Sequence, residues 1–199
     1  MPSHDTYFTL SHSSRAELRE KASRFFGFAD PVKDEMAAAK MRARLKKEYH
    51  DADHQPFAFR LASSLERCSD DGEPQGTAGH PILAQIRQAD LFNVQVVVVR
   101  YFGGTKLGKG GLVRAFGQCA RMTLENAGRK QEQTLRYLDV VCEPEQAGVV
   151  KAVASRFAAT VAALSYDAKA RLRLALPASL FDDCRQALIK RFGPGIFEG

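Results

Sequence analysis

The segment VVVVRYFGGTKLGKGGLVRAF places a glycine-rich loop between an apolar run and a helical pattern. Four residues separate Gly103 from Gly108-Lys109, which nearly matches G-x-x-x-x-G-K-[ST], a loop that binds nucleotide phosphates through backbone N–H groups and a lysine. The hydroxyl that would hold Mg²⁺ is missing, because Gly110 stands in its place. We therefore expect a tight strand-to-helix crossover and no triphosphate site, although the helix start could still bind one backbone phosphate.

A second candidate for chemistry is the stretch SDDGEPQGTAGH, in which three carboxylates precede a histidine. Asp70, Asp71 and Glu73 could bind a divalent metal or act as acid and base, with His80 nearby. Their spacing is not that of an EF-hand, however, and Gly72 favours a turn in which aspartates act as caps. We expect a structural turn, with a metal-assisted hydrolase that uses these four residues as the less favoured alternative.

The stretch HDADH places His50 and His54 four residues apart, a spacing at which two imidazoles on one helix can bind zinc. Gln55-Pro56 follows immediately, and proline disfavours helical conformation in the residue before it. We therefore expect the helix to end before this pair, which leaves the two rings on different faces. No metal or cofactor is predicted for the chain.

The composition is that of a globular protein: of 199 residues, 45% are hydrophobic and 26% are charged. No apolar run approaches the roughly 20 residues of a membrane span, and the start shows no signal-peptide pattern. The four cysteines are far apart and form no C-x-x-C pair, so we expect buried or unreactive thiols in a cytoplasmic protein. The net charge of +6 favours an acidic partner such as nucleic acid.

Apolar periodicity and turn residues predict a mixed order of strands and helices along the chain. Asp30 is the expected N-cap of the first helix, with Pro31 in its first turn, and Gly128 is expected to end the third helix. The expected strands cover residues 6–10, 17–29, 94–101, 134–142, 160–166, 170–176 and 196–197, and residues 57–68 are expected to form one or two more. The expected helices cover residues 32–49, 81–89, 112–127, 145–157 and 178–191.

The last part of this order alternates strand, helix, strand, strand, helix, strand, which is the plan of a ferredoxin-like domain. The prediction is therefore an α+β protein with two domains, residues 1–130 and residues 131–199.

Two quoted stretches, SDDGEPQGTAGHPILAQI and VVVVRYFGGTKLGKGGLVRAF, together closely resemble the signature of the YigZ/IMPACT family. The stretch KASRFFGFA also resembles the family's N-terminal Ser-Arg-Phe segment. The resemblance implies an N-terminal domain folded like the second domain of a small-subunit ribosomal protein, a fold shared with domain IV of elongation factor G. It implies a ferredoxin-like second domain similar to domain V of that factor.

The resemblance also bears on single residues. The family commonly has a small residue at the position of Lys109, so the match to a phosphate-binding loop is coincidental. The family often shows Ala-x-His-x-Cys, whereas this chain keeps Ala52 and His54 but has Pro56 in place of the cysteine. A catalytic or metal-binding Cys–His pair at these positions is therefore excluded.

The function that the resemblance implies is regulation of translation initiation, where eukaryotic members compete for the activator of an initiation-factor kinase. We expect a non-enzymatic cytoplasmic protein that binds RNA or a ribosome-associated partner, with no DNA sequence specificity. A protein-interaction module without nucleic-acid contact is the main alternative. The predicted surface joins two loops that each open a helix, so that two helix N-termini would face one anion site. Its residues are Asp70, Asp71, Gly72, Glu73, Gly76, Thr77, Gly79, Arg100, Gly103, Gly104, Lys106, Lys109, Gly110, Arg114 and Arg121.

Overall fold

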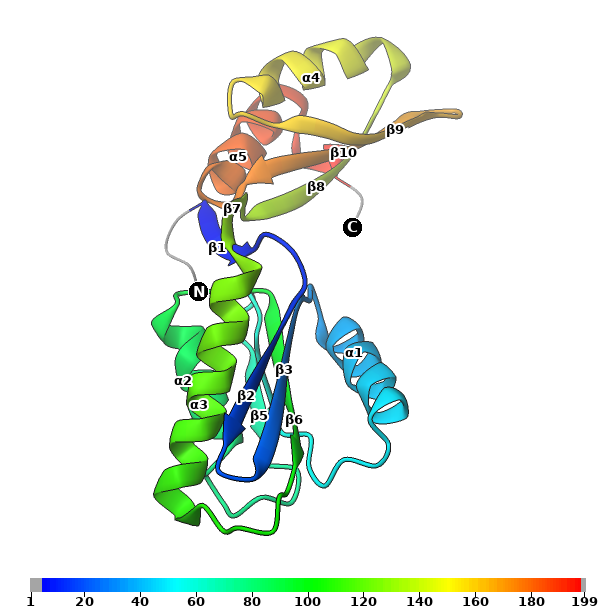
Figure 1. The fold of residues 1–199 in the computed structure, drawn as a ribbon. Coiled ribbons are helices and arrows are strands. Elements are labelled where there is room, and N and C mark those ends of the chain that lie inside the picture. The colour runs from blue at the N-terminus through cyan, green and yellow to red at the C-terminus, as the bar shows by residue number, and fades with distance from the viewer. Residues whose placement is uncertain (1–4, 198–199) are drawn as a thin grey trace. The chain divides into compact units, whose positions relative to one another are not determined.

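The computed structural model describes residues 5–197 and confirms the mixed α+β class (Figure 1). The chain divides into two compact units, one formed by Tyr7–Glu132 and the other by residues 5–6 together with residues 133–197. In the part of the chain that the structure describes, no helix is long and apolar enough to cross a membrane.

The first unit is built on a five-stranded antiparallel sheet with the strand order β2-β3-β6-β4-β5. The central strand β6 is almost entirely buried, because its β-branched side chains are covered on both faces of the sheet. The strands are β2 (Ser14–Glu20), β3 (Ser23–Pro31), β4 (Phe57–Arg60), β5 (Glu66–Ser69) and β6 (Val94–Tyr101).

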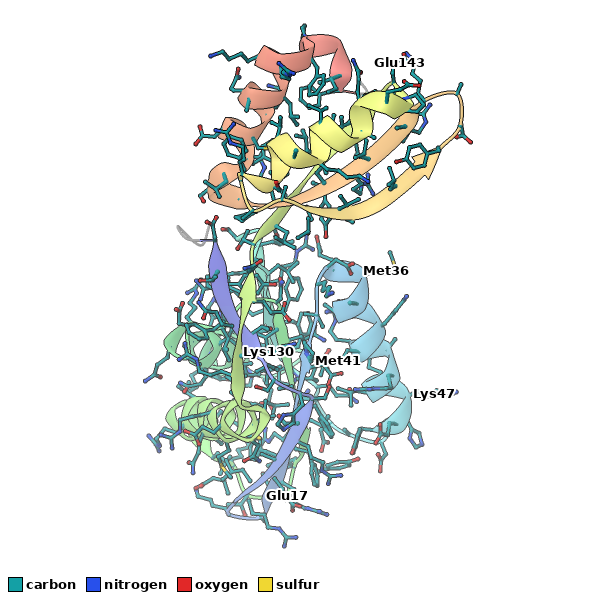
Figure 2. The ribbon with its side chains drawn as sticks, turned by 90° about the horizontal axis from the view of Figure 1, so that it is seen from above. Glu17, Met36, Met41, Lys47, Lys130 and Glu143 are labelled. Carbon is teal, nitrogen blue, oxygen red and sulfur yellow. The ribbon has the colours of Figure 1, made fainter. Side chains whose placement is uncertain are left out.

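Helices cover the two faces of this sheet unequally (Figure 1). Helices α2 (Gly79–Gln88) and α3 (Gly108–Ala127) pack on one face, where they share a core with Val94, Val96 and Val98. Helix α1 (Glu35–Glu48) packs on the other face, where Met41 and Leu45 contact Val97. Figure 2 labels the buried Met41 and the exposed Met36 and Lys47 of the same helix. Because α3 extends over twenty residues, it fixes the position of the loop that precedes it.

The start of α1 differs from the sequence prediction. The N-cap is Asp34, whose carboxylate accepts the N–H of Ala37 at 2.7 Å, and not Asp30. Pro31 is the last residue of β3 and pairs with Val94 of β6. A proline is tolerated at the end of a strand, where its missing N–H removes no interior ladder bond.

A separate two-stranded sheet joins β1 (Thr6–Leu10) to β7 (Arg129–Gln133). The sequence analysis predicted β1 but missed β7. The reason is visible in its residues, RKQEQ, which are all polar and therefore show no alternation of apolar and polar positions. Helix α3 ends as predicted, with Gly128 at a φ of 60°.

The second unit has a three-stranded antiparallel sheet in the order β8-β10-β9, with α4 and α5 packed on one face. Its elements are β8 (Leu135–Cys142), α4 (Ala147–Ser155), β9 (Thr160–Tyr166), β10 (Ala170–Pro177) and α5 (Phe181–Phe192). The predicted last strand is absent from the described residues. Pro194–Ile196 forms a 3-10 turn, and Phe197 makes one isolated antiparallel bridge to Val140 of β8.

Candidate binding cleft

The two loops predicted to form the site border one cleft in the first unit, which we call the loop cleft. Its volume is about 470 Å³. It lies where the acidic loop between β5 and α2 meets the glycine loop between β6 and α3. The lining residues are Asp53, His54, Glu73, Pro74, Arg100, Phe102, Lys106, Leu107, Gly108, Lys109 and Leu112. Four of the predicted residues therefore lie at this cleft: Glu73, Arg100, Lys106 and Lys109.

Asp70 has a structural role in the acidic loop. Its carboxylate accepts N–H groups of Gly76, Ala78 and Gly79 at 2.8, 3.0 and 2.8 Å. Burial alone would raise the pKa of Asp70, but these three backbone donors outweigh it and lower the pKa. The carboxylate therefore occupies the N-terminus of α2. The expectation that this helix start would bind an external anion is wrong, because Asp70 already accepts its first N–H groups.

The rest of the acidic loop is also held by internal bonds. Asp71 accepts the backbone N–H of Gln55 at 2.9 Å, and its carbonyl lies 2.9 Å from Nδ1 of His54. Gly72 has a φ of 89°, and Thr77 is buried and donates its hydroxyl to a carbonyl in the same loop. Within residues 5–197, no three His, Cys, Asp or Glu side chains gather where they could hold a metal ion.

Glu73 and Arg100 form a buried ion pair at the floor of the loop cleft. Oε1 of Glu73 and Nη1 of Arg100 are 2.6 Å apart, and the two side chains are only 1% and 6% exposed. Both residues were predicted to belong to the binding surface, but their side chains are buried and the carboxylate of Glu73 neutralises the guanidinium of Arg100. One donor is left over: in the described part of the chain, Nε of Arg100 has no hydrogen-bond partner. A buried N–H without an acceptor costs about 1–3 kcal/mol, so this donor lowers the stability of the site.

The glycine loop depends on glycine at its first position. A Cβ on Gly103 would lie 1.9 Å from the carbonyl oxygen of Ala22 in the β2–β3 hairpin, so no larger residue fits without a backbone shift. Gly104 and Gly108 have φ values of 84° and 72°. After this turn α3 begins at Gly108 without any side-chain cap. The first-turn N–H groups of α3, including that of Gly110, are therefore available to a ligand.

The predicted cations divide between two places. Lys106 and Lys109 are exposed at the edge of the loop cleft. Arg114 and Arg121 do not line it, since they lie beside Gln85 and Gln88 in a separate depression between α2 and α3. Their spacing of seven residues correctly predicts one shared face of α3, but this face borders α2 and not the glycine loop.

The comparisons with known proteins bear on the whole first unit. The family model of the Impact N-terminal domain matches residues 21–124, which include both loops. The Escherichia coli IMPACT family member YigZ is 33% identical over 163 residues, which cover 80% of each chain. The chain belongs to the IMPACT family. The resemblance stated from the sequence is thereby confirmed.

One further relative and one solved structure are also similar to this chain. The Bacillus subtilis member YvyE is 34% identical over 135 residues, a match that covers 67% of this chain and 62% of the relative's own length. A crystal structure of a hypothetical protein is 29% identical, with a TM-score of 0.72, and covers 96% of this chain and 95% of that one.

Sequence reasoning missed the apolar walls of the cleft in this IMPACT-family chain. Phe102 is 43% exposed, lies at the exit of β6, and lines the cleft together with Leu107 and Pro74. Its backbone N–H donates to the carboxylate of Asp53 at 2.7 Å, which holds this part of the loop in place. An exposed aromatic residue directly before two glycines was the available signal, because a strand core does not require one there.

Pro56, which stands where the family often has a cysteine, takes part in strand pairing through its backbone. The carbonyl of Pro56 accepts the N–H of Val98 at 2.9 Å and continues the pairing with β6. All four cysteines are free thiols. Burial raises the pKa of Cys68, and this leaves its thiol a weak nucleophile at neutral pH.

Proposed function

We propose that this IMPACT-family chain is a non-enzymatic regulator of translation, located in the cytoplasm, that binds a strand of RNA at the loop cleft. The resemblance to the IMPACT family implies a role in regulating translation initiation. Membership in this family supports the same role for this chain. The observation that carries RNA binding is the uncapped N-terminus of α3 at the cleft, next to Lys106 and Lys109. Helix N-termini favour anions, and phosphate is the anion that RNA presents.

The chemistry of the cleft suits one nucleotide unit. A phosphate oxygen would accept first-turn N–H groups of α3, while Lys106 and Lys109 supply positive charge at the edge. The partly exposed ring of Phe102 offers a surface on which a base can stack, an interaction worth about 1–3 kcal/mol. Because Glu73 neutralises Arg100, attraction depends on the two lysines and the helix dipole.

The same geometry gives little support to hydrolysis. Asp70, Asp71 and Glu73 each have a structural partner within the fold. Among the residues that line the cleft in the described part of the chain, there is no Ser, Thr or Cys. The three carboxylates of the acidic loop are thus occupied, and the described residues of the lining offer no hydroxyl or thiol as a nucleophile.

We also propose that residues 1–130 and 131–199 are the two domains, the first related to the second domain of a small-subunit ribosomal protein. The second would be ferredoxin-like. Its strand order β8-β10-β9, with the bridge from Phe197 to the outer side of β8, supports this assignment.

A salt titration of RNA binding tests the function. The double variant Lys106→Glu/Lys109→Glu is compared with Lys40→Glu/Lys47→Glu, whose lysines are exposed on α1. Both pairs change the net charge equally, so diffuse attraction predicts equal losses. We expect a larger loss at the cleft, and a slope of log affinity against log salt that is less steep by about 1.4 for two lost phosphate contacts. Equal losses would contradict the site, and no measurable RNA binding would contradict the function.

A further inference from the structure

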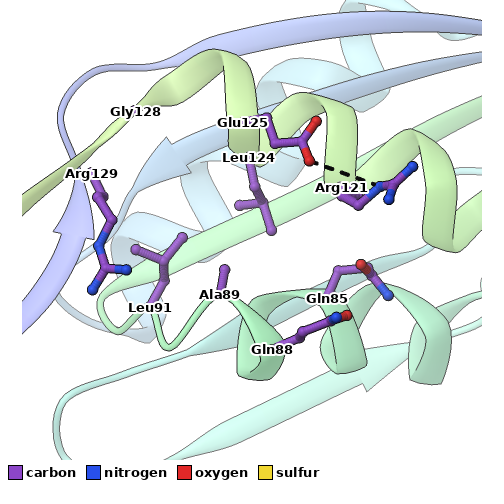
Figure 3. A pocket seen from close by; sticks show the side chains of 9 residues that line it. All are labelled: Gln85, Gln88, Ala89, Leu91, Arg121, Leu124, Glu125, Gly128 and Arg129. Carbon is purple, nitrogen blue, oxygen red and sulfur yellow. Dashed lines mark ion pairs between the residues drawn. The ribbon is translucent and has the colours of Figure 1, made fainter.

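A second depression, separate from the loop cleft, lies between α2 and α3 in the first unit (Figure 3). It consists of two hollows of about 360 and 350 Å³ that share Gln85, Gln88 and Arg121. We call it the helix groove. The first hollow is lined by Gln85, Gln88, Ala89, Leu91, Arg121, Leu124, Glu125, Gly128 and Arg129. The second adds Val113, Arg114, Gly117 and Gln118.

Three arginines run along this groove. Arg114 and Arg121 are seven residues apart on α3, which separates them by roughly 10 Å along the helix axis, and Arg129 follows in β7. Within residues 5–197, no carboxylate forms an ion pair with Arg114 or Arg129. Arg121 has only Glu125, at 3.9 Å, and both of these side chains are more than half exposed. Arg129 lies over the ring of Phe8, with 3.6 Å between its guanidinium carbon and the ring centroid. The positive edge of the groove therefore depends mainly on Arg114 and Arg121.

The floor of the groove is aliphatic. Figure 3 shows Leu124 of α3 facing α2, with Ala89 and Leu91 contributed by the segment that follows α2. Val113, at the other end, is 41% exposed. No aromatic side chain is among the residues that line either hollow in the described part of the chain. The groove thus lacks the rings on which single-stranded bases stack, in contrast to the loop cleft with Phe102.

These observations favour one class of occupant. Guanidinium groups bind carboxylates well, an aliphatic hollow accepts a leucine or isoleucine side chain, and the neutral amides of Gln85 and Gln88 can bond to polar side chains of a partner. The axial spacing of Arg114 and Arg121 corresponds to two turns of a partner helix.

We propose that the helix groove is a docking site for an acidic amphipathic protein helix, with carboxylates on the arginines and an aliphatic anchor in the hollow. This surface is independent of RNA binding at the loop cleft, so each can fail without the other.

The test uses the full chain and a synthetic helix-forming peptide, with acidic residues seven apart and leucine at the intervening helical positions. Fluorescence anisotropy of the labelled peptide gives its affinity for the wild type, for Arg114→Glu/Arg121→Glu, and for the matched control Lys40→Glu/Lys47→Glu. Loss of the two arginine contacts should weaken binding by about tenfold, and the control should change it by less than about twofold. A peptide of the same composition in scrambled order should bind more weakly than the patterned one.

In the peptide measurements, the proposal would be overturned by no binding of the patterned peptide, by equal binding of the scrambled peptide, or by equal weakening in the control variant. A separate measurement compares the same variants for binding of labelled single-stranded RNA. If Arg114→Glu/Arg121→Glu weakens RNA binding as much as peptide binding, the groove is part of a nucleic-acid surface and the proposal is wrong. Lys106→Glu/Lys109→Glu should weaken RNA binding alone, and equal loss of peptide binding in this variant would also contradict two separate surfaces.

Discussion

Several charged side chains of this chain form hydrogen bonds or ion pairs with other residues of the same unit. Arg100 is the clearest example. Its guanidinium pairs with Glu73 below the loop cleft and lies 5.5 and 5.4 Å from the ring centroids of Phe25 and Phe102. Burial of such a pair is costly unless its geometry is good, and truncating one partner would leave the other charge unpaired. Arg100 therefore fixes the position of the acidic loop through its ion pair with Glu73, while its Nε is buried without a hydrogen-bond partner in the described residues.

Asp70 allows a prediction at the scale of one residue. Asp70→Asn should lower the free energy of unfolding at pH 7 by about 1–2 kcal/mol, because three backbone donors lose a charged acceptor. The folded-state pKa of Asp70 is depressed, so this stabilisation is present above the unfolded pKa of about 3.9. It is lost as the pH falls through the lower folded pKa.

Urea unfolding of the wild type and Asp70→Asn at several pH values measures this difference. It should be full at pH 7 and shrink as the pH falls below about 4, since a protonated aspartate resembles asparagine. Asp90→Asn is the control, because the side chain of Asp90 is 70% exposed and has only a 3.8 Å ion pair, so its change should stay within about 0.5 kcal/mol. A difference that does not depend on pH would contradict the role of the carboxylate charge.

At the scale of elements, the sequence predicted those parts of the fold that carry a strong periodic pattern. The bounds of β6 and β9 agree with the prediction, and α3 ends where Gly128 indicates, because apolar periodicity and a stop glycine act locally. β7 was missed because its pairing with β1 depends on a distant segment. The sequence predicted that the acidic loop and the glycine loop lie at one cleft. The internal partners of Asp70 and Arg100 depend on tertiary contacts, which the spacing of residues along the chain does not reveal.

The exit of β6 gives a prediction at the scale of elements. Gly103→Ala should destabilise the first unit by about 1–3 kcal/mol, because the new methyl group overlaps the backbone of the β2–β3 hairpin. Gly110→Ala, in the first turn of α3, is the control change. A Cβ there meets only Arg114 Nη1 at 3.6 Å, so it should be neutral or stabilise α3 by up to about 1 kcal/mol. Thermal unfolding of both variants compares them, and equal melting temperatures would contradict the close approach.

At the scale of the whole molecule, the net charge does not determine where a partner binds. The charge of +6 gives long-range attraction to any polyanion, but it does not say where a partner binds. Within the first unit, the structure separates two cationic surfaces with different surroundings. One combines lysines, an open helix start and an aromatic ring, and the other combines arginines and an aliphatic hollow. Short motifs with similar charge can therefore serve different chemistry when the fold gives them different neighbours.

The stability of the whole chain in the presence of ligands distinguishes a nucleotide-binding loop from a backbone-phosphate site. A ligand at a hundred times its Kd adds about 2.7 kcal/mol, which for a chain of this size raises the melting temperature by roughly 5–10 °C. We expect no such shift with ATP or GTP and Mg²⁺, because Gly110 offers no hydroxyl to the metal. Single-stranded RNA at low salt should raise the melting temperature of the wild type, and this increase should be lost at high salt or in Lys106→Glu/Lys109→Glu. A saturable shift with Mg-nucleotide would restore the nucleotide-binding interpretation, whereas an RNA shift that survives the double variant would place the contact outside the loop cleft.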